Sequence, residues 1–108
     1  MMQTSEIQKR FSQIEQSIEQ MVDACQTDPT VPMDLKDCVD KMDQQTDMAK
    51  QALQSNDPSR IRQCVDELEQ LGDLAKQACQ TTSNVEPALK NAVMNAHDEL
   101  SDLKHELH

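Results

Sequence analysis

Apolar side chains recur along this chain with the spacing of a helix surface, in four separate segments. In the first segment, about residues 6–25, they alternate in steps of four and three residues: Ile7, Phe11, Ile14, Ile18, Met21 and Cys25. In the fourth, about residues 86–107, the same steps join Leu89, Val93, Ala96, Leu100, Leu103 and Leu107. Such stripes are typical of helices that pack side by side in a coiled-coil-like way.

Two further helices are predicted between these segments, over about residues 33–53 and 58–79. The second segment carries Leu35, Val39, Met42, Ala49 and Leu53, and the third carries Ile61, Val65, Leu68, Leu71, Ala75 and Ala78. Thr46 takes one position of the second stripe, which is weakest there. Gly72 lies inside the third segment, where glycine costs about 1 kcal/mol relative to alanine. Since Leu71 and Leu74 continue the pattern, Gly72 predicts a close contact with a neighbouring helix.

Short polar turns separate the four segments. Prolines interrupt the chain within Asp28–Pro32, and Asp57 and Pro58 suit the N-cap and first position of the third helix. Residues 80–84 form a third polar turn. Turns this short make consecutive helices run antiparallel. The sequence therefore predicts one all-α domain over residues 1–108, an antiparallel up-down four-helix bundle with coiled-coil-like seams.

A sequence repeat runs through the same segments. Each of three segments ends on a similar motif, at steps of 28 and 26 residues: Ala24–Thr27, Ala52–Ser55 and Ala78–Thr81. Longer matches join Cys38–Asp40 to Cys64–Asp66 and Asp47–Ala52 to Asp73–Ala78. Self-similarity at a fixed period indicates the structural unit, so we expect a helix-turn repeat of about 27 residues.

The charge of the chain narrows its possible partners. A formal net charge of −10 repels phosphate backbones and anionic membranes, so we expect no nucleic-acid or membrane partner. The sequence has neither an apolar leader nor the roughly 20 consecutive apolar residues of a membrane span. We therefore expect a cytoplasmic protein with reduced cysteines.

Cysteine is the most suggestive reactive residue in this chain. In the predicted bundle, Cys25, Cys38 and Cys79 fall toward one end, where three thiols are candidate ligands for a soft metal or candidates for oxidation. Each also lies on or beside an apolar stripe, where cysteine packs as a small apolar residue. We expect core packing and predict no metal and no cofactor.

No set of residues assembles a catalytic site. The sequence lacks a glycine-rich phosphate loop, a nucleophile elbow and an arrangement that indicates a catalytic triad, so we expect no enzyme. The histidines all fall in the fourth segment: His97, His105 and His108. A ferritin-like di-iron site is excluded because the chain has no Glu-x-x-His motif.

Methionines and aspartates are the candidate partner-binding residues. Methionine adapts to varied surfaces, and the aspartates of the second segment suit a basic partner. The candidates are Met21, Met42, Met48, Asp40, Asp43 and Asp47. The sequence predicts a small acidic protein-interaction module, acting as an adaptor, regulator or chaperone. The alternatives are a thiol-based metal or redox protein and a structural homo-oligomer that pairs through the first and fourth segments.

Overall fold

The computed structural model describes residues 4–81 and 85–107, which form four α-helices and no strand. The helices are α1 (Thr4–Thr27), α2 (Met33–Gln54), α3 (Pro58–Thr81) and α4 (Pro87–Leu107). The predicted all-α class is confirmed, and each helix begins and ends within two residues of the predicted segment. Residues 82–84 of the third predicted turn lie outside the described residues.

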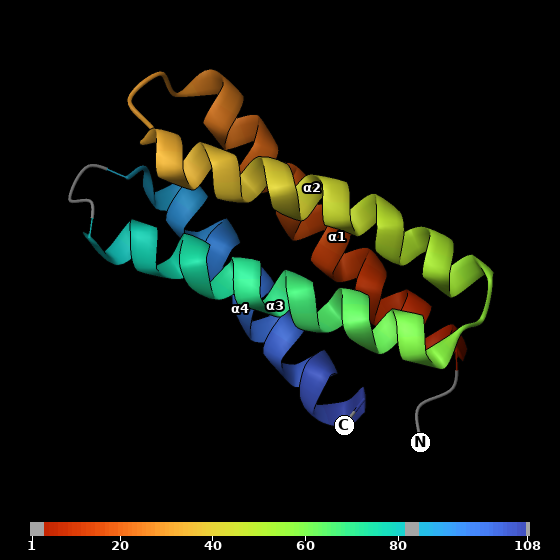
Figure 1. Ribbon diagram of the computed structural model, residues 1–108. Coiled ribbons are helices and arrows are strands. Elements are labelled where there is room, and N and C mark those ends of the chain that lie inside the picture. The colour runs from red at the N-terminus through yellow and green to blue at the C-terminus, as the bar shows by residue number, and fades with distance from the viewer. Residues whose placement is uncertain (1–3, 82–84, 108) are drawn as a thin grey trace.

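Each helix packs against two others. Helix α1 contacts α2 and α4, and α3 contacts the same two helices. Figure 1 shows the turn between α2 and α3 at the same end as the start of α1 and the end of α4. The end of α1 and the end of α3 lie at the opposite end of the molecule, which measures 41 × 21 × 18 Å. Within the described ranges, no helix combines the length and apolar character needed to cross a membrane.

The predicted apolar stripes form the core. Helix α1 buries Ile7, Phe11, Ile14, Ile18 and Met21, and α4 buries Leu89, Val93, Ala96, Leu100 and Leu103. Thr46 is buried in the gap of the α2 stripe, where its hydroxyl donates a hydrogen bond to the Met42 carbonyl at 2.7 Å. This hydrogen bond gives the buried Thr46 hydroxyl a partner, so the polar group is not left unsatisfied in the core.

A polar pair crosses each of the four helix interfaces. The pairs with their closest distances are Arg10–Glu106 at 3.0 Å between α1 and α4, Lys50–Glu15 at 2.6 Å between α1 and α2, His97–Asp73 at 2.5 Å between α3 and α4, and Gln45–Glu67 between α2 and α3. Exposed ion pairs typically contribute about 0–1 kcal/mol each. These pairs therefore help to select neighbours and alignment, whereas apolar burial supplies most of the stability.

Capping side chains fix the turns. The Arg60 backbone N–H donates to Asp57 Oδ1 at 3.3 Å, which confirms Asp57 as the cap before Pro58. In the turn between α1 and α2, Asp28 Oδ1 accepts hydrogen bonds from the Thr30 N–H at 2.9 Å and the Thr30 hydroxyl at 2.6 Å. These bonds lower the pKa of Asp28.

Helix α3 runs unbroken through Gly72, which is buried against α4. A Cβ added at Gly72 would lie 3.7 Å from Leu100 Cδ1 and 3.8 Å from the His97 Cα atom. These are ordinary van der Waals distances, so the interface accepts a methyl group at this position without displacing α4.

We predict that Gly72→Ala raises the free energy of unfolding by about 0.5–1 kcal/mol, because alanine lowers the entropic cost of forming the helix. Urea denaturation measures the change, and Gln70→Ala, at an exposed position of the same helix, is the matched control with a change of about 0.3 kcal/mol or less. A destabilised Gly72→Ala variant would mean that α3 and α4 approach each other more closely than these distances allow.

Candidate protein-binding surface

Three large apolar side chains are exposed in the described part of the chain. Met33 is 69% exposed, Leu74 51% and Met48 46%, whereas the stripe residues of the core are at most 7% exposed. Isolated exposed apolar residues are common on folded proteins. Exposed apolar residues indicate a binding site when they belong to one contiguous surface.

Met48 and Leu74 belong to one face, formed by α2 and α3 together. The Gln45 amide donates a hydrogen bond to the Glu67 carboxylate and joins the two helices on that face. Residues three, four or seven positions along a helix share a face. The residues on this face, called the α2–α3 face below, are Cys38 and Met48 from α2 with Leu71, Leu74 and Ala78 from α3.

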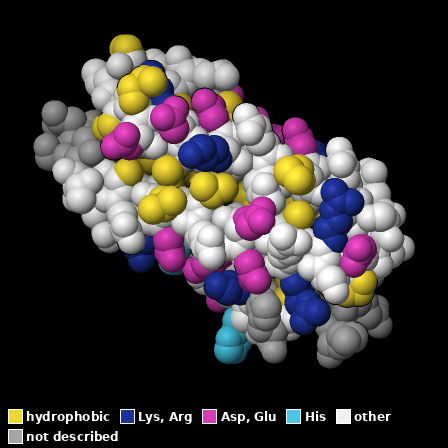
Figure 2. Space-filling model, in the orientation of Figure 1, with side chains coloured by type: hydrophobic (Ala, Val, Ile, Leu, Met, Phe, Trp, Pro, Cys, Tyr) yellow, Lys and Arg dark blue, Asp and Glu magenta, His cyan; other side chains and the backbone are white. Residues whose placement is uncertain are grey.

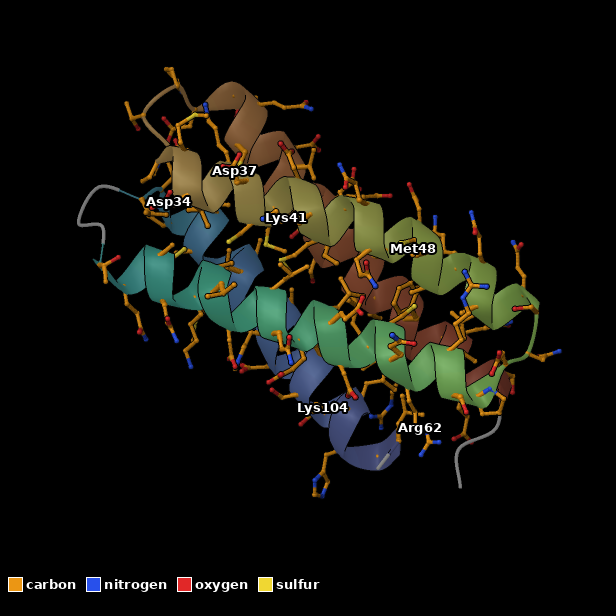
Figure 3. The ribbon with its side chains drawn as sticks, in the orientation of Figure 1. Asp34, Asp37, Lys41, Met48, Arg62 and Lys104 are labelled. Carbon is orange, nitrogen blue, oxygen red and sulfur yellow. The ribbon has the colours of Figure 1, made fainter. Side chains whose placement is uncertain are left out.

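Figure 2 shows hydrophobic side chains gathered over α2 and α3, with acidic and basic side chains around them. Figure 3 places Asp34, Asp37, Lys41 and Met48 on this side of the molecule. Burial is the largest cause that raises the pKa of the Cys38 thiol. Of the neighbouring charges, Lys41 lowers this pKa, and Asp34 and Asp37 raise it. The α2–α3 face is therefore an apolar surface with a carboxylate pair at one end.

The methionines predicted to bind a partner divide between core and surface. Met21 is fully buried and Met42 is 1% exposed, so neither contacts a partner unless the helices separate. Met48 lies on the α2–α3 face. Stripe positions explain this division, because Met21 and Met42 continue the a/d spacing and Met48 flanks it.

The predicted aspartates lie apart from the α2–α3 face. Asp40 raises the pKa of Cys25 on α1, after burial as the largest cause. Asp47 acts on Lys50, whose pKa is raised chiefly by its hydrogen bond to Glu15 of α1. Both aspartates therefore lie on the flank of α2 that faces α1, while Asp43 is exposed between them in the sequence. The structure does not bring these three carboxylates together with Met48 as one docking strip.

The cysteines are free thiols. Cys25 and Cys38 are half-buried, whereas Cys64 and Cys79 are buried. Cys25 and Cys79 lie close enough for Cys79 to raise the pKa of Cys25. Cys25, Cys38 and Cys79 do not form a group whose sulfurs all lie within 4.8 Å of one another in the described residues. Cys25 and Cys79 therefore lie in the same region of the molecule, whereas Cys38 belongs to the α2–α3 face.

A polar cluster between α3 and α4 was not predicted from the sequence. His97 contacts Asp73, which is 24 residues away, and Glu69 lies beside them. His105 is exposed, and His108 lies outside the described residues. Only the spacing of Glu69 and Asp73, one helical turn apart, could have indicated the cluster, and acidic pairs with that spacing are common on helix surfaces.

The stripes of α1 and α4, which were candidates for pairing between copies, are buried inside the single chain. Helix α1 packs against α4, and their central stripe residues Ile14 and Leu100 have no exposed surface. A homo-oligomer that pairs through these stripes would first have to separate the two helices.

We predict slow thiol chemistry in the native chain. Burial raises the pKa of Cys64 and Cys79 above the ordinary value of 9.0, so the thiolate is scarce at pH 8 and becomes the major form only at a higher pH than in the unfolded chain. Alkylation with iodoacetamide, followed site by site with mass spectrometry, should be at least about tenfold slower at these two cysteines than in 8 M urea, with Cys38 faster than both. Equal native and denatured rates at Cys79 would contradict its burial.

No protein-family model, curated protein or solved structure matches this chain. A functional proposal therefore rests on the structure alone, and the α2–α3 face carries two of the three exposed large apolar side chains of the described residues.

Proposed function

We propose that this protein is a non-catalytic protein-interaction module, and that its α2–α3 face binds a basic amphipathic helix of a partner protein in the cytoplasm. The observation that carries the proposal is the exposure of Met48 and Leu74 on one face of a chain that buries nearly all its other large apolar side chains. A groove between two helices accepts the apolar side of a third helix.

Charge supports a basic partner. The chain carries a net charge of −10, and Asp34 and Asp37 lie beside Cys38 at one end of the apolar surface. Complementary charge at the rim of an interface speeds association and selects among partners. A helix with lysines or arginines flanking its apolar stripe fits both features.

We also propose the finer architecture: an antiparallel up-down bundle with coiled-coil-like seams, built from a helix-turn repeat of about 27 residues. The arrangement of ends and turns in Figure 1 supports the antiparallel order. Burial supports the repeat, since positions 26 residues apart in α2 and α3 are equivalent. The buried pairs are Leu35 with Ile61, Val39 with Val65, Met42 with Leu68, Thr46 with Gly72, Ala49 with Ala75 and Leu53 with Cys79.

The repeat also relates the exposed residues of the α2–α3 face. Met48 and Leu74 are 26 residues apart, and so are Cys38 and Cys64. In an antiparallel pair joined at Gln45 and Glu67, Cys38 lies level with Leu74 and Met48 lies level with Cys64. The face then carries Leu74 beside Cys38 toward one end and the exposed Met48 toward the other, over the buried Cys64. A helix with two apolar anchors fits this spacing.

We predict that Leu74→Glu weakens binding of a designed basic amphipathic helix by at least about tenfold, because it removes an apolar anchor and places a charge in the desolvated contact. The probe is a fluorescent peptide of about 20 residues with a leucine stripe and a lysine-rich polar face, long enough at 1.5 Å per residue to run along the α2–α3 face. Anisotropy titrations measure the dissociation constant. Because Leu74 is half exposed, the variant should keep the stability of the parent within about 0.5 kcal/mol.

Met33→Gln is the matched control. Met33 is more exposed than Met48, and it lies five residues before Cys38, about 140° away around α2. This variant should bind the peptide like the parent, and a peptide with glutamates in place of its lysines should bind weakly. Equal losses in Met33→Gln and Leu74→Glu, or equal affinity for the basic and acidic peptides, would contradict the proposed surface.

A further inference from the structure

A histidine and two carboxylates converge where α3 packs against α4. Glu69 and Asp73 lie one turn apart on α3, and His97 reaches them from α4. One ligand atom from each of the three residues lies within 4.8 Å of the other two. All three residues are half-buried, and the His97 side chain is only 13% exposed. This cluster is on the opposite flank of α3 from the α2–α3 face, since Glu67 and Glu69 point to different neighbours.

The three ligand atoms match the chemistry of a divalent transition-metal ion. Imidazole nitrogen and carboxylate oxygen are zinc ligands, with bonds of about 2.0–2.2 Å that put tetrahedral ligand atoms about 3.3 Å apart. His97 Nε2 and Asp73 Oδ1 are now 2.5 Å apart and share a hydrogen bond. Replacing that proton with an ion requires the two atoms to separate by less than about 1 Å.

A second observation concerns the other nitrogen of the same ring. His97 Nδ1 is buried without a hydrogen-bond partner, and the nearest carboxylate oxygen, Asp98 Oδ1, lies 3.6 Å away. When Nε2 binds a metal, Nδ1 carries the ring proton and needs an acceptor, which is usually a carboxylate or a carbonyl. A small rotation of the exposed Asp98 side chain supplies that acceptor.

The positively charged Lys104 side chain lies next to the cluster. Its Nζ donates to Glu69 Oε2 at 3.3 Å, and the side chain is 39% exposed, so it can swing into solvent. A hollow of about 280 Å³ lined by Glu69, Ser101, Lys104 and His105 opens beside the cluster. The hollow gives room for water to complete the coordination of an ion bound by three protein ligands.

We propose that Glu69, Asp73 and His97 bind one divalent transition-metal ion, with Zn²⁺ as the best match, and that Lys104 competes with the ion for Glu69. The ion would link α3 to α4. The histidine ligand selects Zn²⁺ over Mg²⁺ and Ca²⁺, which prefer oxygen ligands alone.

Isothermal titration of the untagged, reduced full chain with ZnCl₂ tests the proposal. We expect one ion per chain, and a loss of at least about tenfold in affinity for both His97→Gln and Asp73→Asn. Lys104→Met should strengthen binding by about fivefold, because the competing charge is removed. An increase in Zn²⁺ affinity cannot result from partial unfolding of the variant. Circular dichroism verifies that each variant is folded.

Two controls separate this site from other zinc ligands of the chain. Asp43→Asn removes an exposed carboxylate of α2, outside the cluster, and should keep the parent affinity. Cys25→Ser combined with Cys79→Ser should do the same. Zn²⁺ binding that survives His97→Gln, or that is lost in the cysteine variant, would overturn the proposal. A titration without binding, or an equal loss in Asp43→Asn and Asp73→Asn, would overturn it as well.

Discussion

Burial of one apolar stripe on each helix is the constraint on which the rest of this structure depends. Only 36% of the residues are hydrophobic and one is aromatic, so the core has to use nearly every large apolar side chain available. Ile14, Leu35, Leu68 and Leu100 therefore meet in one interior without exposed surface. Because the chain has few apolar residues, the large apolar side chains that remain exposed, such as Met48 and Leu74, are informative about function.

The polar contacts differ in kind among the four helix interfaces. Between α1 and its neighbours, Arg10–Glu106 and Lys50–Glu15 are surface ion pairs that align helices. Between α3 and α4, the His97–Asp73 pair is more enclosed, and it lies beside Gly72 where the two helices approach closely. Between α2 and α3, the Gln45–Glu67 bridge lies within an apolar surface. The proposed ion-binding cluster and the proposed partner-binding face thus lie on separate flanks of α3.

Much of the fold could be predicted from the sequence because a stripe reports which side of a helix is buried. The steps through Ile7–Met21 and Leu89–Leu103 identified core residues, and Asp57 and Pro58 identified the start of α3. The candidate site was harder to predict. The stripe of α2 explains why Met42 is buried, but Met48 only flanks that stripe, and the rotation of α2 against its neighbours decides whether such a flanking residue is covered or exposed. The contact of His97 with Asp73 likewise depends on which helices are neighbours and on their relative height, which local patterns do not record.

Methionine methyl NMR with a soluble paramagnetic agent tests whether the α2–α3 face is exposed and binds a partner. Methionines lie in the core, on the α2–α3 face and outside it, so each region has its own methyl signal. From their exposure, we expect strong relaxation of the Met33 and Met48 methyl groups and protection of Met21 and Met42. Addition of the basic amphipathic peptide should then protect Met48 and leave Met33 relaxed. Relaxation of Met21 and Met42 in the free chain, or a Met48 signal that the peptide does not change, would contradict these expectations.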